Sequence, residues 1–311
     1  MSEADRSASG MTRRAVLGGL AGASVAGFVY RAASGTDMTV RDVREAGLVG
    51  RLFSPARPTG LPAVVSLAGA GGGLWEAPAR ALAREGFTAL ALATHNYEGR
   101  PERLRLLPVE YVVDAVEWLR RTARPEGGLV ALRGWSRGGE LALLAAALTP
   151  AINAVLAYAP RCYVAREQNK QDNFGDPNAV AAFTWKSREV EGSALPKEQW
   201  LDPAKPSFEE LYAIPVERIA GPIMFVTGTA DTGIVGTTAE FSSGQAIRRL
   251  KLASFAHRYV HYSYPGAGHS IADPPPFTGP LIGGGTITAD MAAVADSWPR
   301  SLAFLHAIQG A

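Results

Sequence analysis

The sequence predicts an α/β domain in which helices cover both faces of a mostly parallel β-sheet. Beyond residue 35, short apolar runs that suit buried strands alternate with longer segments of helical spacing, a pattern typical of a parallel sheet. The 311 residues are 47% hydrophobic and 19% charged, which describes a chain with a globular core. A serine turn flanked by glycines, at residues 134–138, separates one strand-like run from one helix-like run.

The predicted elements follow one another along the chain. Strands are expected at residues 49–53, 63–67, 87–92, 129–132, 154–158, 223–227 and 259–264. Helices are expected at residues 78–85, 109–121, 137–148 and 245–254, followed by a closing helix that Thr288 caps and that continues through His306. In the second helix Val112, Val116 and Leu119 share one face, as in a helix that packs on a sheet.

Residues 161–216 interrupt this alternation. The segment is polar and rich in proline, with Pro177, Pro196, Pro203, Pro206 and Pro215. Because proline breaks regular elements, we interpret the segment as a cap or insertion over the carboxyl edge of the sheet, where such segments shape substrate access. A solvated connection with no part in binding is the alternative interpretation.

The N-terminus resembles a bacterial twin-arginine export signal. Arg13 and Arg14 precede an apolar stretch rich in glycine and alanine that ends near Tyr30. This stretch is short for a membrane span, which needs about 20 apolar residues. We therefore interpret residues 1–35 as a signal segment and residues 36–311 as the folded domain. The expected location is extracytoplasmic: periplasmic, secreted, or anchored to the membrane by an uncleaved signal. A buried N-terminal helix is the alternative.

The serine turn is the motif that carries chemistry. Residues 134–138 read Gly-Trp-Ser-Arg-Gly between a predicted strand and a predicted helix. In that setting a serine is held on a sharp, strained turn at the top of the sheet, with its hydroxyl exposed. Gly134 and Gly138 flank the turn where a Cβ would collide with the neighbouring backbone. Ser136 is therefore the candidate nucleophile, and an idle serine in a surface loop is the alternative.

A serine hydroxyl needs a base, and the base needs a carboxylate that orients it. In this type of fold the chain order is serine, then acid, then histidine. Of the five histidines, His269 fits best, because it lies in a glycine loop directly after the predicted strand 259–264. The remaining histidines lie in strands, in helical segments or before any suitable acid: His95, His257, His261 and His306.

Asp231 is the candidate acid. It follows the predicted strand 223–227, at the carboxyl edge where such sheets place their chemistry. Asp202 lies in the insertion and Asp273 comes after the histidine, so both fit the chain order less well. An ordinary turn aspartate is the alternative interpretation of Asp231.

The oxyanion hole is expected to combine two backbone donors. One is the N–H of Arg137, the residue after the nucleophile, and the other comes from the glycine-rich loop after the strand 63–67, with Ala70 or Gly71 as the donor. A phosphate-binding loop is excluded because no Lys-Ser or Lys-Thr pair follows these glycines.

Composition narrows the classes of partner. The formal net charge of +2, without a dense basic run beyond the N-terminus, gives no reason to expect a nucleic-acid partner. The single cysteine, Cys162, allows no internal disulfide and is interpreted as a small buried apolar residue. We expect no metal and no cofactor, because no cluster of histidine, aspartate or cysteine has the spacing of metal ligands.

Several separate blocks together resemble a known family, over about residues 39–308. The chain resembles the C-terminal α/β-hydrolase domain of acyl-CoA thioesterases and bile acid-CoA:amino acid N-acyltransferases. The blocks that carry the resemblance are the glycine loop 71–74 with Glu76, Asn96-Tyr97, the elbow 134–140, residues 214–218, the histidine loop 264–269 with Ile271 and Pro274-Pro275, and Gly283-Gly284.

The resemblance implies an α/β-hydrolase fold and a catalytic triad of Ser136, Asp231 and His269. It implies a serine acyl hydrolase that cleaves a small-molecule thioester or ester through an acyl-enzyme, with an acyl thioester as the first expectation. The relatives' N-terminal β-sandwich domain is not expected here. Trp75, Tyr97 and Trp185 are candidate linings of the acyl pocket, and packing is an equal alternative for each.

Three alternatives to an acyl thioesterase stay open. Export would separate the protein from coenzyme A thioesters, which favours a carboxylesterase similar to dienelactone hydrolases. An acyltransferase is less expected, because relatives that conjugate bile acids use cysteine at the elbow and this chain has Ser136. A non-catalytic binding module on a hydrolase scaffold is the third, since fold alone does not decide function.

Overall fold

The computed structural model describes residues 37–167, 179–193, 211–234 and 237–310. All of these belong to one structural unit, Ala32–Ala311. The predicted signal segment lies outside the described residues. None of the described helices combines the length and the apolar character that crossing a membrane requires.

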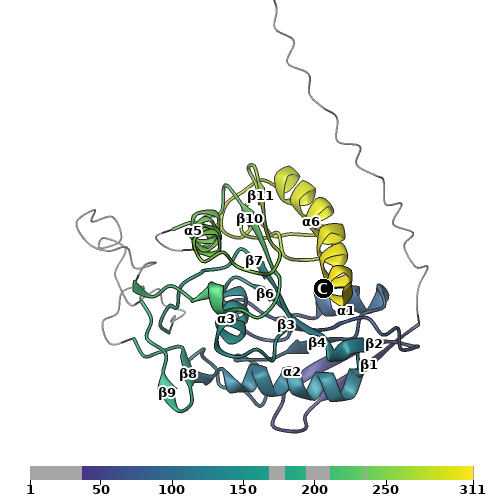
Figure 1. Ribbon diagram of the computed structural model, residues 1–311. Helices are drawn as coiled ribbons and strands as arrows, with labels where there is room; N and C mark the ends of the chain where they lie inside the picture. Colours follow the sequence, from purple (N-terminus) through teal and green to yellow (C-terminus); the bar gives the residue numbers. More distant parts are fainter. Residues whose placement is uncertain (1–36, 168–178, 194–210, 235–236, 311) are drawn as a thin grey trace, which may run out of the picture. The chain divides into compact units, whose positions relative to one another are not determined.

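An eight-stranded sheet runs through the described part of the chain (Figure 1). Its spatial order is β1-β2-β4-β3-β6-β7-β10-β11, and only the pairs β1–β2 and β2–β4 are antiparallel. The strands are β1 (Met38–Val43), β2 (Gly50–Pro55), β3 (Ala63–Leu67), β4 (Ala89–Leu92), β6 (Val130–Trp135), β7 (Ala154–Tyr158), β10 (Ile223–Gly228) and β11 (Tyr259–Tyr264). This mostly parallel sheet confirms the predicted fold class.

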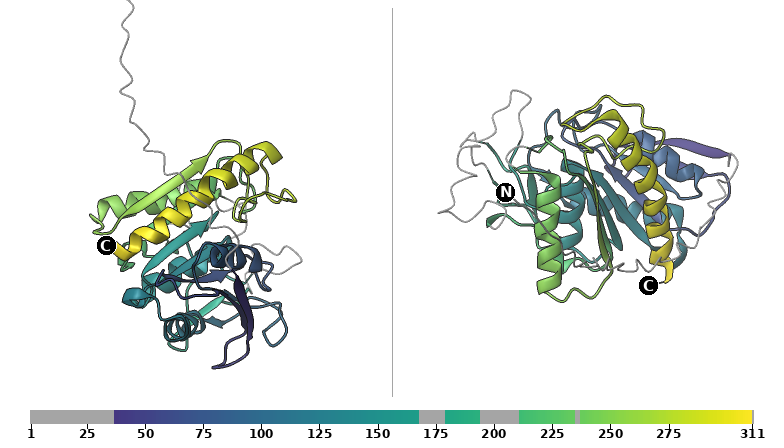
Figure 2. Two further views of the ribbon diagram at one scale, coloured as in Figure 1. Left: turned by 90° about the vertical axis from the view of Figure 1, so that its right-hand side faces the viewer. Right: turned by 90° about the horizontal axis from the view of Figure 1, so that it is seen from above.

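Helices cover both faces of the sheet (Figure 2). Helices α2 (Glu110–Ala123), α3 (Arg137–Leu148) and α5 (Ala239–Leu252) pack on one face, and α1 (Glu76–Arg84) and α6 (Ile287–Ala307) on the other. Neighbouring residues of β3 point to opposite faces: Val65 joins the core beneath α2 and α3, and Val64 joins the core beneath α1 and α6. Every residue of β3 is buried, as expected for a strand covered on both sides.

The boundaries differ from the sequence prediction at identifiable places. Strand β1 was not predicted, because four of its six residues are exposed and its apolar residues do not alternate regularly along the whole strand. The predicted cap Thr288 is wrong: Thr286 caps α6, and its hydroxyl accepts the Ala289 N–H at 3.2 Å. Helix α5 begins at Ala239, six residues before the predicted start, because Thr238 caps it by accepting the Phe241 N–H at 3.0 Å.

Part of the predicted insertion belongs to a second, small sheet. Strand β5 (Leu107–Pro108) pairs with β8 (Phe183–Trp185), and β8 pairs with β9 (Arg188–Glu189). Residues 168–178 and 194–210 of the segment lie outside the described residues. The role of residues 161–216 as a cap over the sheet edge therefore stays a prediction.

Candidate active site

Ser136 occupies the turn between β6 and α3. Its backbone angles, φ 54° and ψ −118°, are those of a strained position for a residue with a Cβ, and such positions cost about 1–3 kcal/mol and cluster at functional sites. The Ser136 N–H donates to the carbonyl of Tyr158 at the end of β7, at 2.8 Å. The Ser136 side chain makes no capping hydrogen bond to α3, so the helix does not engage the hydroxyl.

The two predicted glycines are required by close backbone contact. A Cβ on Gly134 would lie 2.1 Å from the carbonyl oxygen of Gly138, and a Cβ on Gly138 would lie 2.4 Å from that of Leu67. Real Cβ atoms do not approach backbone so closely, and tight packing leaves no slack to absorb the clash. Glycine at these positions lets the turn fold tightly under Ser136.

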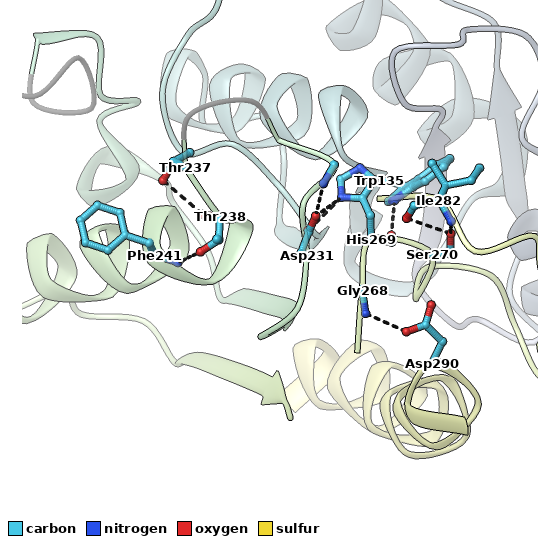
Figure 3. Close-up of polar contacts among 11 residues, drawn as sticks. Trp135, Asp231, Thr237, Thr238, Phe241, Gly268, His269, Ser270, Ile282 and Asp290 are labelled. Atoms are coloured by element: carbon cyan, nitrogen blue, oxygen red, sulfur yellow. Dashed lines mark hydrogen bonds and ion pairs between the residues drawn. The ribbon is translucent and has the colours of Figure 1, made fainter. Parts of the chain in front are cut away.

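Asp231 and His269 form a hydrogen-bonded pair (Figure 3). The imidazole Nδ1 lies 2.8 Å from Oδ2 and 3.0 Å from Oδ1 of Asp231, and both residues are almost fully buried. They follow β10 and β11, which are adjacent parallel strands, so their loops meet at the same edge of the sheet. A carboxylate that accepts from Nδ1–H leaves Nε2 as the nitrogen that can take up a proton.

A glycine strap, residues 283–285, holds the two loops together. The carbonyl of Gly283 accepts the N–H of Thr232 at 2.9 Å and the N–H of His269 at 3.2 Å, so one oxygen joins the acid loop to the histidine loop. Gly284 pairs with Asp231 and has φ 85°, and a Cβ there would lie 2.1 Å from the carbonyl oxygen of Ala230. Only glycine fits this approach.

Two further contacts fix the histidine loop. Asp290 in the first turn of α6 accepts the N–H of Gly268 at 2.7 Å (Figure 3). The indole N–H of Trp135, the residue before Ser136, donates to the carbonyl of His269 at 2.9 Å, and the two rings are 5.4 Å apart between centroids. The elbow and the histidine loop are therefore in direct contact, while the link between the Ser136 hydroxyl and the imidazole stays a prediction.

The glycine-rich loop after β3 lies beside Ser136. A Cβ on Gly69 would be 3.3 Å from the Cβ of Ser136. The predicted donors Ala70 and Gly71 are exposed, and neither amide N–H donates to backbone within the described part of the chain. Their carbonyls are anchored: His95 Nε2–H donates to Ala70 O at 3.0 Å, and the Asn96 amide donates to Gly71 O at 2.7 Å.

His95 is a residue that sequence reasoning passed over. It is 3% exposed, and Nδ1 lies 3.0 Å from the hydroxyl of Thr94. Burial, with Arg137 and Arg100 nearby, lowers the pKa of His95 and favours the neutral ring. Because Nε2 faces a carbonyl it must carry the proton, so the neutral ring accepts from Thr94 and donates to Ala70. The only sequence signal was its place directly after a buried strand.

Arg137 is predicted to act through its backbone, and its side chain has a separate structural role. The guanidinium and the Glu140 carboxylate are 1% and 0% exposed and bond at 2.6–2.8 Å. Arg137 also donates to the carbonyls of Ala165 and Arg166, and Glu140 accepts the N–H of Ala165 at 2.9 Å. This buried pair fastens the start of the 161–216 segment to the elbow helix.

A pocket of about 550 Å³ opens beside the paired loops. Its walls are Leu74, Trp75, Glu76, Ala77, Trp135, Ser270, Ala272, Asp273, Phe277, Thr278, Gly279, Pro280 and Ile282. Trp75 is one of its walls, whereas Tyr97 and Trp185 do not line it, and a role in binding an acyl group stays a prediction. No group of metal-ligating side chains is found within the described ranges.

A largely parallel sheet that begins with antiparallel strands, with a serine elbow and an acid–histidine pair at its carboxyl edge, defines the α/β-hydrolase class. Solved structures share this fold. An esterase from Pyrobaculum calidifontis has a TM-score of 0.55 at 16% identity and covers 89% of this chain and 87% of its own. A dienelactone hydrolase-like phosphotriesterase from metagenomic libraries has a TM-score of 0.52 at 18% identity, covering 86% of this chain and 97% of its own.

Sequence relatives identify the family. Residues 107–310 match the family model described as BAAT / Acyl-CoA thioester hydrolase C terminal. Human acyl-coenzyme A thioesterase 1 is 30% identical over 292 residues, which cover 85% of this chain and 64% of the relative. Human mitochondrial acyl-coenzyme A thioesterase 2 is also 30% identical, with 85% and 56% covered. The chain belongs to the BAAT/acyl-CoA thioester hydrolase family, which confirms the resemblance, and it spans less than two thirds of the length of these relatives.

Proposed function

We propose that this chain is a serine acyl hydrolase that cleaves a small-molecule thioester or ester, with Ser136 as nucleophile, His269 as base and Asp231 as the orienting acid. The observation that carries the proposal is the buried pair of Asp231 and His269, joined at 2.8 Å beside the strained Ser136 turn. A buried carboxylate on Nδ1 holds the imidazole in the tautomer that can accept a hydroxyl proton at Nε2.

The reaction proceeds in two halves. The Ser136 oxygen attacks the carbonyl carbon while its proton passes to His269 Nε2, and Asp231 stabilises the imidazolium. The tetrahedral intermediate collapses, the leaving group takes that proton from His269, and an acyl ester of Ser136 remains. Water then gives a proton to His269 and attacks the acyl carbon, and the acid departs as Ser136 regains its proton.

The negative oxygen of each tetrahedral intermediate is proposed to lie between the N–H of Arg137 and the N–H of Ala70 or Gly71. The Arg137 amide is at the start of α3, where N–H groups have no partner within the helix. In a trans peptide the C=O and the following N–H point in opposite directions. Since His95 holds the Ala70 carbonyl, the Gly71 N–H points away from His95, which makes Gly71 the stronger candidate for the second donor.

An acyl thioester is the first candidate substrate, because the relatives are named acyl-coenzyme A thioesterases. The N-terminal resemblance to a twin-arginine signal favours a second candidate, a carboxylic ester met outside the cytoplasm. Export itself is a proposal, and intact-mass analysis of protein recovered from cell fractions tests it. Retention of the whole protein in the cytoplasm would contradict it and remove the reason for preferring esters.

Labelling with a fluorophosphonate probe tests the nucleophile. Labelling is expected at Ser136 in the parent and in the control variant Ser254→Ala, which removes an exposed serine after α5, and is expected to disappear in Ser136→Ala. Turnover should fall by at least about 10³-fold in Ser136→Ala. Unchanged turnover in Ser136→Ala would mean that Ser136 is not the nucleophile. A folded parent protein that never labels and never turns over would instead favour a non-catalytic binding module. A panel of acyl-CoAs and p-nitrophenyl esters on protein without residues 1–35 then separates thioesterase from esterase.

A further inference from the structure

The pocket walled by Trp75, Trp135 and Phe277, called here the indole pocket, begins one residue away from the proposed catalytic groups. Trp135 precedes Ser136 and Ser270 follows His269, and both line the pocket. In Figure 3 the Trp135 side chain lies next to the imidazole, and Ser270 lies farther from it, beside Ile282. A substrate group that enters the pocket is therefore only a few bonds away from the reacting carbonyl. The volume of about 550 Å³ falls within the range of small-molecule sites.

The indole rings are held in place by hydrogen bonds. Trp135 donates to the carbonyl of His269 at 2.9 Å, and Trp75 donates to the carboxylate of Asp273 at 2.7 Å. Their ring centroids are 5.9 Å apart with the planes tilted by 39°. Because their polar N–H groups are already satisfied, the rings present apolar faces that need no rearrangement on binding.

The charged groups at the pocket are carboxylates. Glu76 and Asp273 line it, and Glu76 is shared between Arg51 at 2.7 Å and Arg80 at 3.1 Å. Asp273 accepts from the neutral indole of Trp75 and forms no ion pair among the described residues. A ligand group that carries a negative charge would meet Asp273 with no lining cation to offset it.

A further cation, Arg133, lies behind the Trp75 wall. Arg133 is 1% exposed, its guanidinium is 4.7 Å from the Trp75 ring centroid, and it donates to the carbonyl of Ala272. It is not one of the lining residues. The Trp75 ring lies against the guanidinium, and Arg133 interacts electrostatically with Asp273, so part of the Arg133 charge is already offset by that carboxylate.

We propose that the indole pocket holds the acyl group of the substrate, and that it selects an uncharged apolar or aromatic acyl group over one that ends in a carboxylate. This inference rests on the proposed acyl hydrolase function. In a coenzyme A thioester the leaving part carries several phosphate charges, so the apolar, acid-lined pocket suits the acyl part. An aromatic acyl group would pack against indole rings that are already fixed, beside the Trp75–Trp135 pair and not between its two rings.

The test compares acyl groups at a constant leaving group. The p-nitrophenyl esters of acetic, hexanoic, phenylacetic and glutaric acid give kcat/KM for each acyl group, and methylumbelliferyl esters of acetic and hexanoic acid vary the leaving group. Parent protein should prefer phenylacetyl and hexanoyl over glutaryl by at least about tenfold, from the combined loss of apolar contact and added repulsion. A preference for glutaryl would overturn the proposal.

Two variants locate the effect. Ala77→Trp fills the pocket from an exposed lining position and should lower the ratio of phenylacetyl to acetyl kcat/KM by about tenfold or more. Asp273→Asn keeps an acceptor for the Trp75 indole and should raise the ratio of glutaryl to hexanoyl by at least about threefold. Asp114→Asn, on the exposed side of α2 away from the pocket, is the charge-matched control and should leave that ratio unchanged.

The outcomes separate this inference from the proposed function. If Ala77→Trp changes the ratio between the two leaving groups and not the ratio between acyl groups, the pocket holds the leaving group. If neither ratio changes in Ala77→Trp or in Thr278→Trp, which fills the pocket from another wall, the pocket is not used. Either result overturns the inference while probe labelling and turnover still support an acyl hydrolase. Loss of labelling and turnover in the parent would defeat the function itself.

Discussion

The first prediction concerns His95, because its side chain contacts the proposed oxyanion loop and is not expected to contact the substrate. Its Nε2–H donates to Ala70 O at 3.0 Å, and its own carbonyl accepts the Gly73 N–H at 2.8 Å. The perturbation is His95→Phe, which removes the side-chain donor and keeps a ring of similar shape. His95→Gln restores a donor on a side chain that can reach the same carbonyl.

The expected magnitude follows from two separate effects. Loss of one hydrogen bond costs about 1 kcal/mol of stability. Complete loss of an oxyanion donor costs about 10²–10³-fold in kcat, and a loop that has lost one of its anchors retains part of that donor, so His95→Phe should lower kcat by about 10–100-fold. KM should change by less than about threefold, because the ground-state carbonyl binds the loop weakly.

The assay is steady-state hydrolysis of one ester, with urea unfolding of each variant. The matched control is His261→Phe. His261 on β11 is also a partly buried histidine with a hydroxyl partner, Thr227 at 2.7 Å, and burial lowers its pKa as it does for His95. His261→Phe should lose similar stability and keep kcat within about threefold of the parent. His95→Gln should recover at least half of the lost activation free energy.

Two results would refute this reasoning. One is a kcat in His95→Phe within twofold of the parent at a measurable loss of stability, which would make His95 an ordinary buried residue. The other is an equal loss of kcat in His261→Phe, which would mean that kcat follows general stability and not the position of the glycine loop.

Further predictions concern stability and the loops. Burial lowers the pKa of His95, so as pH falls below about 6.5 the unfolded chain binds a proton that the folded chain does not, and stability is lost. The stability advantage of the parent over His95→Gln, measured by urea unfolding, should therefore shrink from pH 7.5 to pH 5. An advantage that grows would contradict the assignment. Glu140→Gln leaves the Arg137 charge buried and should cost about 3–5 kcal/mol, against at most about 1 kcal/mol for Glu217→Gln in the half-exposed pair with Arg249, both by urea unfolding. Gly284→Ala forces the strap away from the Ala230 carbonyl and should lower both kcat and the unfolding midpoint. Gly244→Ala on the exposed side of α5, where a Cβ meets nothing within 4 Å, is the control and should leave kcat unchanged.

The central strands of the sheet were predictable because they are buried on both faces. Residues 63–67, 154–158 and 259–264 coincide with β3, β7 and β11, since each is a short run bounded by turn residues. Strand β1 was not predicted because the residues of this edge strand are mostly exposed and show no regular apolar alternation. The start of α5 was missed because its first turns hold few apolar side chains and the Thr238 cap was overlooked.

The paired acid and histidine loops were predictable from order along the chain, whereas the contacts that support them were not. Asp231 and His269 each follow a strand, and adjacent parallel strands bring their loops to one edge. The strap carbonyl of Gly283 and the carboxylate of Asp290 act through backbone hydrogen bonds. Backbone partners leave no side-chain pattern in a single sequence, apart from the glycines that allow the close approach.

Arg133 is the clearest example of a structural feature that the sequence does not predict. The predicted strand stopped at Leu132 because an arginine is rarely buried, yet β6 continues to Trp135 with Arg133 inside the core. Its guanidinium lies 4.4 Å from the Tyr158 ring centroid, 4.7 Å from that of Trp75 and 5.8 Å from that of Trp298. Burial lowers the pKa of the guanidinium, and aromatic faces offset part of the cost of a desolvated cation. These rings come from a loop, a strand and a distant helix, so the tertiary fold alone creates the environment that permits the charge, and that charge supports the Trp75 wall of the indole pocket.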